Sequence, residues 1–542
     1  MRPFNAEGKF HPVTKGERQL RCLAVRGAGA AVSAQGLSLG IQMIATVVLA
    51  RLLTPSDFGV VTMVTTVSLL IMNFGLNGFT EAVVQIEEIT HTLASNLFWI
   101  NVGASLLLTI GFASAGSLLS WFYRDPRVAS VTIGVSLTIL VTGVSVLHLA
   151  LLKRAMEFPG IAANDVLARA ASVVTSITLA LLGCGYWALV AGVVALPLST
   201  AVGSWVLCRW TPSLPRRVPG TAKLVRYAIN VYGHFAANYF ARNTDNVLVG
   251  WRFGARSLGF YKKAYDLFAL SSSQLVSPIT GVAVSALSRL KNDTLQYRRY
   301  LLRALALLAF VALGVGANLS LVGKDLIRVI LGPGWEESGR IFVFFGPGIG
   351  VMLLYYTHGW IHLSIGTPDR WFRWGIIELL VTGTLFLVGL PWGGVGIAMA
   401  WTVSFWILML PAFWYAGKPI GFGVGPVVGV IWRYIVAAIL ATSASLMVLF
   451  HAHPYGPGTG MGEALARMVT VSVLFWTFYL VAVVALYRSI DPIYYVLKLL
   501  PDMLPFLRSR KLEHPAFDPK DERCADSTLQ MTSEEILESS GR

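Results

Sequence analysis

The residues with the greatest chemical potential lie in one row of a predicted helix. Asn230, His234, Asn238 and Arg242 follow at intervals of four residues, and Asp245 comes three residues later. Residues four apart share one face of an α-helix, so these side chains form a polar stripe. The flanking sequence is apolar, where polar groups need a cavity or a partner. The stripe therefore indicates a hydrated surface with Arg242 as the cation for an anionic ligand, or a structural pairing of Arg242 with Asp245.

A weaker polar row lies near the N-terminus. Gln35, Ser38 and Gln42 interrupt an apolar stretch that Arg51 ends. One interpretation places Gln42 and Arg51 in the same hydrated cavity as the stripe, with Arg51 as a second cation. The other interpretation makes the amides hydrogen-bonding groups between packed membrane helices.

Charged residues also occur in two further apolar stretches. Lys262, Lys263 and Asp266 begin one of them, where the lysines could contact an anionic ligand or extend to the membrane surface. Asp165 and Arg169 lie four residues apart in the other, a spacing typical of a local ion pair. Both aspartates are candidates for ion coupling or ion pairing.

Three ionisable residues have no charged partner close in sequence. Glu378 could carry a coupling proton or act as a hydrogen-bonded structural acid. His358 and His362 are four residues apart, as in metal sites, but no third ligand is near them. The four cysteines show no paired spacing that would indicate disulfides or a metal site. We therefore expect neither a metal nor a cofactor.

These residues belong to a chain with the composition of a membrane protein. Of its 542 residues, 55% are hydrophobic and 13% are charged, whereas soluble domains carry about 25% charged residues. Apolar runs of about 20 residues, long enough to cross a bilayer, recur along most of the chain. The predicted fold class is all-α integral membrane, with about fourteen transmembrane helices. The expected spans are 28–52, 58–79, 96–122, 129–152, 160–182, 186–208, 224–251, 258–285, 301–323, 341–365, 372–391, 394–416, 428–450 and 467–487.

The distribution of lysine and arginine predicts the orientation. Basic residues gather before the first span and after the fourth, sixth, eighth and last spans. These positions share one side, and an excess of Lys and Arg marks cytoplasmic loops, so both termini are expected in the cytoplasm. The net charge of +15 then reflects orientation and anionic lipid headgroups, not nucleic acid.

The chain looks duplicated. Residues 56–59 and 256–259 each join two apolar stretches by a very short turn that ends in glycine, and a similar offset relates Gly185 to Gly394. Such offsets predict two six-helix lobes in parallel repeat, plus two extra C-terminal helices, with a cavity between the lobes. The expected segments are a basic cytoplasmic N-terminus (1–26), a first lobe (27–210), a cytoplasmic linker (211–223), a second lobe (224–416), two further spans (417–490) and a cytoplasmic, largely disordered tail (491–542).

Short segments along the chain carry a family resemblance. They are residues 49–59, 151–158, 245–261, 282–290, 326–335 and 366–370. Together, and in this order, they resemble Wzx-type polysaccharide flippases of the multidrug/oligosaccharidyl-lipid/polysaccharide (MOP) superfamily, in particular the colanic-acid exporters.

The resemblance implies a transporter without catalytic activity. It would translocate polyprenyl-diphosphate-linked oligosaccharide repeat units by alternating access, for exopolysaccharide or lipopolysaccharide biosynthesis. The implied partners are this lipid-linked substrate, membrane lipids, a polysaccharide polymerase and a chain-length regulator. The cavity candidates for the substrate are Arg242, Arg51, Asn238, His234, Asn230, Gln42, Lys262 and Lys263; the coupling or ion-pair candidates are Asp245, Asp165, Arg169, Asp266 and Glu378.

Two other classes of protein stay open. A cation-coupled multidrug antiporter of the same superfamily needs a more acidic cavity, whereas this chain offers two arginines and two lysines among its candidates. A polytopic polysaccharide polymerase or glycosyltransferase usually needs a sizeable loop outside the membrane, but the predicted loops are short and no Asp-x-Asp motif occurs. The phosphate-binding loop of nucleotide-driven pumps is absent as well.

Overall fold

The computed structural model of the protein describes residues 3–5, 7–10, 17–86, 88–216, 221–452, 460–491 and 494. Within these ranges the regular structure is helical, and extended residues pair only in two isolated bridges. The α-helices are α1 (Glu17–Leu52), α2 (Pro55–Gln85), α3 (His91–Ser114), α4 (Gly116–Tyr123), α5 (Arg127–Arg154), α6 (Phe158–Leu181), α7 (Tyr186–Cys208), α8 (Thr221–Arg289), α9 (Thr294–Leu331), α10 (Glu336–Tyr355), α11 (His358–Ile365), α12 (Pro368–Gly389), α13 (Gly393–Gly417), α14 (Val424–Ala452) and α15 (Met461–Tyr487). Two short 3₁₀ turns, Leu390–Trp392 and Lys418–Ile420, flank α13.

Ten helical stretches of the described chain are long and apolar enough to cross a membrane. Helix α6 has a similar length, but Asn164, Asp165 and Arg169 make it less apolar, and the 69-residue α8 is the more polar because it contains the predicted stripe. Helices suit the bilayer because each satisfies its backbone hydrogen bonds internally. The prediction of an all-α, multi-pass membrane protein is confirmed.

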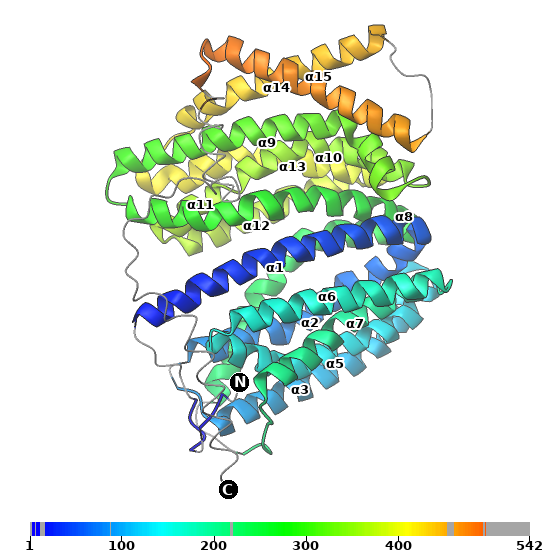
Figure 1. Cartoon of the computed structure of the whole chain (residues 1–542), viewed down its shortest axis with the longest axis vertical. Coiled ribbons are helices and arrows are strands. Elements are labelled where there is room, and N and C mark those ends of the chain that lie inside the picture. Colours follow the sequence, from blue (N-terminus) through cyan, green and yellow to red (C-terminus); the bar gives the residue numbers. More distant parts are fainter. Residues whose placement is uncertain are drawn as a thin grey trace, which may run out of the picture.

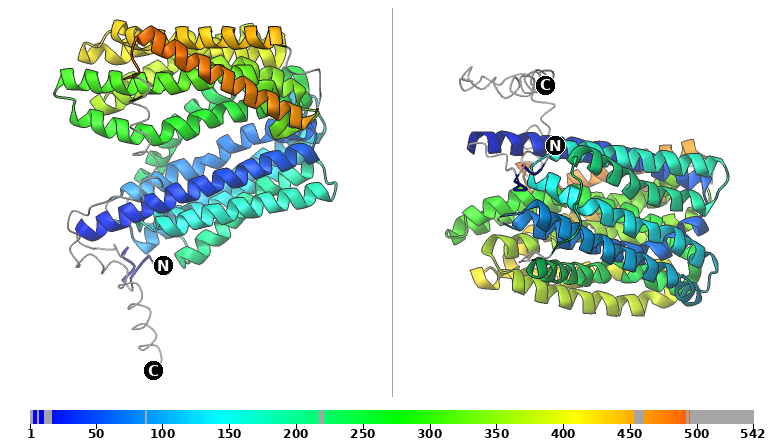
Figure 2. Two further views of the ribbon diagram at one scale, coloured as in Figure 1. Left: turned by 45° about the horizontal axis from the view of Figure 1, so that its top comes forward. Right: turned by 90° about the horizontal axis from the view of Figure 1, so that it is seen from below.

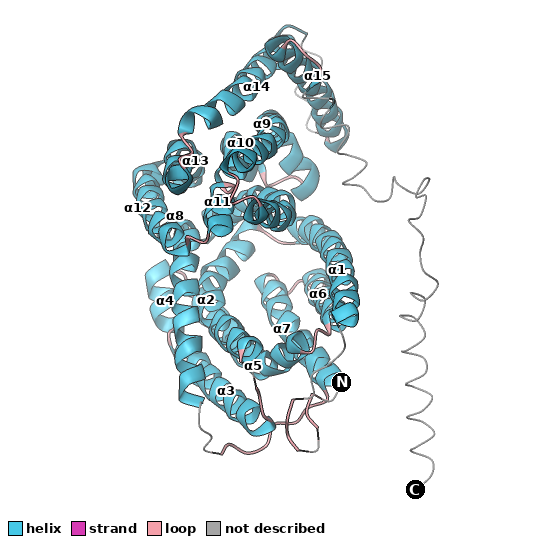
Figure 3. Cartoon of the chain, turned by 90° about the vertical axis from the view of Figure 1, so that its left-hand side faces the viewer, coloured by secondary structure: helices cyan, strands magenta, loops and turns pink. Residues whose placement is uncertain are grey.

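The helices run side by side in roughly one direction and form two groups when seen end-on (Figures 1 and 3). The first group contains α1 to α7, and the second contains α9 to α13. Helix α8 connects them, because it contacts α2 on one side and α10, α11 and α13 on the other. Helices α14 and α15 contact α9 and lie at the outer edge of the second group (Figure 2).

Helix breaks differ from the predicted spans in two places. Spans 96–122 and 341–365 each consist of two helices, with breaks at Ala115 and at residues 356–357. Spans 224–251 and 258–285 both lie within α8, whose helical backbone is interrupted between them at Gly254, where φ is 77° and ψ is −178°. Such a φ strongly favours glycine, so this residue alone supplies the turn that the sequence placed between two helices.

A small hairpin of residues 4–10 covers one end of the first group. Phe4 pairs with Phe10, and Lys9 pairs with Thr90. The Phe4 ring lies 5.3 Å from the His91 ring and 6.1 Å from that of Trp210, measured between centroids. Helix α1 begins well before the span predicted from residue 28, because a helix can continue outside the hydrocarbon into basic sequence. The predicted tail, 491–542, lies almost wholly outside the described residues.

Candidate functional site at the contact between two hairpins

Two helical hairpins meet at one end of the helices. The first hairpin (residues 45–63) joins α1 to α2, and the Asp57 carboxylate closes its turn by accepting hydrogen bonds from the Thr54 amide at 2.9 Å and the Thr54 hydroxyl at 2.6 Å. Pro55 begins α2, where its fixed φ and missing N–H are tolerated. The second hairpin (residues 245–263) surrounds the break in α8 at Gly254.

The two hairpins touch reciprocally, backbone to backbone. A Cβ atom placed on Gly59 would lie 1.7 Å from the carbonyl oxygen of Ala255, and one on Gly259 would lie 1.8 Å from the carbonyl oxygen of Pro55. Residue 59 thus faces residue 255 while residue 259 faces residue 55. Only glycine lets helices approach this closely. We call this the hairpin contact, and it joins α2 of the first group to α8.

Trp335, in the loop between α9 and α10, is buried beside the hairpin contact. Its indole N–H donates to the Ala50 carbonyl at 2.8 Å, and its ring lies 5.5 Å from the Phe58 ring and 5.9 Å from the Phe260 ring. One side chain of the second group therefore touches both hairpins. Buried tryptophan typically combines apolar contact with one satisfied N–H in this way.

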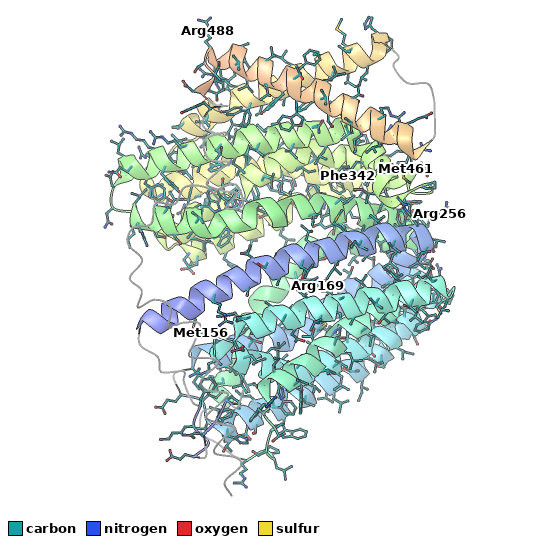
Figure 4. All side chains as sticks on the ribbon, viewed as in Figure 1. Met156, Arg169, Arg256, Phe342, Met461 and Arg488 are labelled. Carbon is teal, nitrogen blue, oxygen red and sulfur yellow. The ribbon has the colours of Figure 1, made fainter. Side chains whose placement is uncertain are left out.

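The cations predicted near this end make specific contacts. Arg51 donates from Nη2 to the Val329 carbonyl at 3.2 Å, at the end of α9. Lys263 holds its Nζ 4.0 Å from the centroid of the Phe58 ring, so it reaches from the second hairpin to the first. Lys262 forms an ion pair with Asp266, with 2.8 Å between Nζ and Oδ1. Arg256 and Met461 lie at this end of the helices, and Met156 and Arg488 lie at the other (Figure 4).

Asp245 is fully buried between α8 and α13 and accepts hydrogen bonds from three sides. Its Oδ2 accepts from the Tyr261 hydroxyl at 2.6 Å and from the Trp401 indole N–H at 3.0 Å, and its Oδ1 accepts from the Asn246 amide at 2.8 Å. Charge-assisted hydrogen bonds of this kind satisfy a buried carboxylate. The sequence analysis did not identify Tyr261 and Trp401, because aromatic residues are common in apolar helices. The only signal was that each carries one hydrogen-bond donor, a hydroxyl or an indole N–H.

The polar stripe belongs to the part of α8 before Gly254. The side chains of Asn230, His234, Asn238 and Arg242 lie outside the described residues. On the same helix segment, the hydroxyls of Tyr232 and Tyr239 donate to the carbonyls of Leu70 and Thr66 in α2, at 3.0 and 2.9 Å. These tyrosines are seven residues apart, so one face of α8 is held against α2.

The other candidates are dispersed. Gln42 is exposed on α1, and Asp165 and Arg169 are exposed on α6, where none of the described ion pairs joins them. Glu378 is half-buried on α12, and the Tyr355 hydroxyl of α10 is its hydrogen-bond partner. These residues therefore lie on different helices from those that form the hairpin contact.

One ion pair in apolar sequence was not foreseen. Arg467 of α15 donates from Nε to Asp325 of α9 at 2.9 Å and makes a second hydrogen bond from Nη2 to the same carboxylate. The bidentate geometry fixes α15 on α9. The two residues are far apart in sequence, so local spacing carried no signal of their pairing.

Comparison with known proteins places this geometry in a family. Residues 48–340 match the polysaccharide biosynthesis protein family, and this region begins in the first hairpin and ends just after Trp335. The chain is 23% identical over 378 residues to the succinoglycan biosynthesis transport protein ExoT of Rhizobium meliloti, which covers 69% of this chain and 76% of ExoT. It is 21% identical over 324 residues to the lipopolysaccharide biosynthesis protein WzxC of Escherichia coli, covering 59% of this chain and 65% of WzxC.

A solved structure shares the fold. The lipid II flippase MurJ, in an inward closed conformation, superposes with a TM-score of 0.67 at 13% sequence identity. The match covers 86% of this chain and 99% of MurJ. The arrangement of helices is therefore that of a known flippase over almost its whole length.

Proposed function

The chain belongs to the polysaccharide biosynthesis protein family, and on this premise we propose that it carries polyprenyl-diphosphate-linked oligosaccharide across the bacterial inner membrane. The predicted resemblance to Wzx-type flippases of the MOP superfamily is confirmed by the family match, by the transport relative ExoT and by the fold shared with MurJ. The cargo is delivered outward for exopolysaccharide or lipopolysaccharide assembly. The process is transport and needs no covalent chemistry by the protein.

The hairpin contact is the observation that carries a transport mechanism. Alternating access needs two groups of helices that meet at one end and part there to release cargo. Gly59 and Gly259 meet the opposite hairpin with bare backbone. At the two glycines themselves, no side chains interlock and have to disengage when the hairpins separate. The charged headgroup crosses between the helix groups while the prenyl chain stays in lipid.

We propose about fourteen spans in two lobes, with the boundaries expected from the sequence, 27–210 and 224–416. Helices α3 with α4, and α10 with α11, count as one span each, and α8 counts as two spans around Gly254. The reciprocal packing of residues 59 and 259, two hundred positions apart, supports a parallel repeat. Helices α14 and α15 lie outside the repeat.

This arrangement makes the end with the hairpin contact the outer one. Both termini and residues 289–303 are then cytoplasmic, as the excess of Lys and Arg favours. Reporter fusions at Arg299 and at Trp335 test the assignment, and we expect opposite sides of the membrane. A result with both reporters on one side contradicts the proposed number of spans.

Arg242 is proposed as a cargo cation on the polar stripe. Asp245 accepts hydrogen bonds from Tyr261, Trp401 and its own helix, so its satisfaction does not depend on Arg242.

Substitution of Arg242 tests this cargo contact. The planar fork of arginine holds a pyrophosphate by paired hydrogen bonds, which lysine cannot reproduce. We expect Arg242→Lys to reduce export and Arg242→Ala to abolish it, at normal protein levels. Exposed Arg252, on the same helix, provides the control Arg252→Ala with normal export. Restored export in Arg242→Ala combined with Asp245→Asn would make the arginine a structural partner of the acid.

Deletion of the gene tests the function itself. We expect loss of surface polysaccharide and accumulation of complete lipid-linked repeat units in the cytoplasmic leaflet. A polymerase and a chain-length regulator would act on the same units after export. Accumulation of incomplete repeat units would favour an enzyme. Unchanged polysaccharide with greater sensitivity to cationic drugs would favour an antiporter.

A further inference from the structure

A buried histidine pair lies where a predicted membrane span is broken. Helix α10 ends at Tyr355 and α11 begins at His358, inside a single apolar stretch, Glu336–Ile365. His358 and His362 are 3% and 1% exposed. Broken helices in membrane transporters often surround ion sites, and ionisable groups at membrane depth are seldom retained without a role.

The tautomer of His358 follows from its hydrogen bond. Its Nδ1 lies 2.6 Å from the Tyr355 carbonyl oxygen, which can only accept, so Nδ1 carries the proton. In neutral His358 the other ring nitrogen, Nε2, is then an unprotonated base. This Nε2 is buried and has no hydrogen-bond partner in the described part of the chain. A buried nitrogen lone pair without a donor can accept a proton.

His362 presents a second nitrogen of the same kind. Its Nδ1 lies 3.1 Å from the Thr367 hydroxyl, and its Nε2 is buried and without a partner among the described residues. The two imidazole rings are 5.9 Å apart between centroids and nearly perpendicular. Two imidazolium charges this close would repel each other, so the pair favours a single positive charge.

The groups around the pair include one acid and one guanidinium. The Tyr355 hydroxyl of α10 accepts the Trp374 indole N–H at 2.9 Å and is the hydrogen-bond partner of Glu378 on α12, whereas His358 contacts the backbone carbonyl of Tyr355. On the other side, Arg370 of α12 donates to the Tyr415 carbonyl of α13 at 2.6 Å. Further phenol, hydroxyl and indole contacts come from α8 and α9: Thr280 with Trp360, and Tyr297 with Ser364.

We propose that His358 and His362 form a binding site for one proton, with Nε2 of His358 as the receiving atom and His362 as the neighbour that stays neutral. The arriving proton comes from water. Because both histidines lie on α11, directly after the break that follows α10, the charge state of the pair alters the packing of α11 against α12 and α13. The proton site itself does not depend on the proposed flippase function. Its consequence does: if the protein is a flippase, proton binding is coupled to the transport cycle.

The titration of single histidines tests the site without any transport assay. The full-length protein in lipid nanodiscs is followed by hydrogen–deuterium exchange at the imidazole C2 position, read by mass spectrometry. We expect His358 to titrate between about pH 4 and pH 8, the range in which histidines in proteins change charge. His362→Leu should move the His358 midpoint by about one pH unit, since it removes the neighbouring imidazole. His451→Leu, at an exposed position on α14, is the matched control and should leave the midpoint unchanged.

Two outcomes overturn the site. One is the absence of a His358 titration in this range, as expected if the buried ring stays neutral throughout. The other is an unchanged midpoint in His362→Leu. Failure of the flippase function is a separate result, because it appears as normal surface polysaccharide in the deletion strain. A titrating pair whose His358→Gln variant exports normally over the same pH range would overturn the coupling.

Discussion

The two hairpins share a backbone contact and differ in chemistry. Around the reciprocal glycines, the first hairpin buries apolar residues at Ala45, Val61 and Met63. Two hundred residues on, the second hairpin has Asp245, Tyr261 and Lys263. The feature that the two hairpins share at this end is therefore close-packed backbone at Gly59 and Gly259. The ionic interactions are concentrated in the second half, where they hold α8 to α13 and reach across to Phe58.

The largest effect is expected from breaking the shared feature. A methyl group on Gly59 or Gly259 would overlap a carbonyl oxygen, so Gly59→Ala and Gly259→Ala should each force the hairpins apart. Overpacking typically costs about 1–3 kcal/mol. We expect export to fall by about fivefold or more, since about 1.4 kcal/mol corresponds to a factor of ten. Surface polysaccharide per unit of inserted protein measures the effect.

Gly36 and Gly429 provide the controls for this experiment. A Cβ at either position meets open space, so their alanine variants should export normally. The disulfide yield between cysteines introduced at Ser56 and Arg256 should fall in the Gly59 and Gly259 variants, as the hairpins separate. If both variants export as well as Gly36→Ala does, the hairpin contact has no role in transport.

A smaller effect is expected where the hairpins differ. Tyr261→Phe removes a hydrogen bond to the buried Asp245 carboxylate and should lower the free energy of unfolding by about 1.5–3 kcal/mol. Tyr479→Phe also removes a tyrosine hydroxyl, but this one donates to a neutral acceptor, the Phe310 carbonyl. Its loss should lower the free energy of unfolding by about 1 kcal/mol. Thermal unfolding in detergent compares the two variants. Equal losses would mean that Asp245 is not charged in the folded protein.

The smallest effect is expected from making the second hairpin more like the first. Lys263→Met introduces the residue found at position 63 and removes the cation over the Phe58 ring, worth about 0.5–2 kcal/mol. Lys262→Met breaks a partly exposed ion pair with Asp266 instead, worth about 0.2–1 kcal/mol. We expect the disulfide yield between cysteines at positions 56 and 256 to fall more in Lys263→Met than in Lys262→Met. The reverse order would show that Lys263 does not stabilise the closed end.

The helices could be predicted from sequence wherever a flanking residue ends them. The span expected at 186–208 coincides with α7. Gly185 precedes this helix, and Arg209, which follows it, has a left-handed backbone conformation. The turn expected between spans 224–251 and 258–285 corresponds to the interruption of α8 at Gly254, although the sequence placed this turn at residues 256–259. By contrast, the interruptions at Ala115 and at residues 356–357 were not foreseen, because apolar sequence continues through them. Helix breaks of this kind depend on backbone dihedral angles, which composition does not report.

The site was predictable only where partners share a helix. Lys262 and Asp266, four residues apart, were identified as one charged group and form an ion pair. The bond from Trp335 to Ala50 and the pairing of Asp325 with Arg467 join distant helices, so periodicity carries no information about them. The stripe of residues 230–242 stays a prediction.

The hairpin of residues 4–10 has a consequence for the order of assembly during synthesis. The surface under Phe4 includes His91 and Trp210, and Arg154 lies 5.1 Å from the Phe10 ring. Residues 4–10 therefore reach their final place only after α7 and Trp210 have been made. They are the last part of the first helix group to pack, although they precede α1 in the sequence. A bulky fusion directly before Phe4 would obstruct that step.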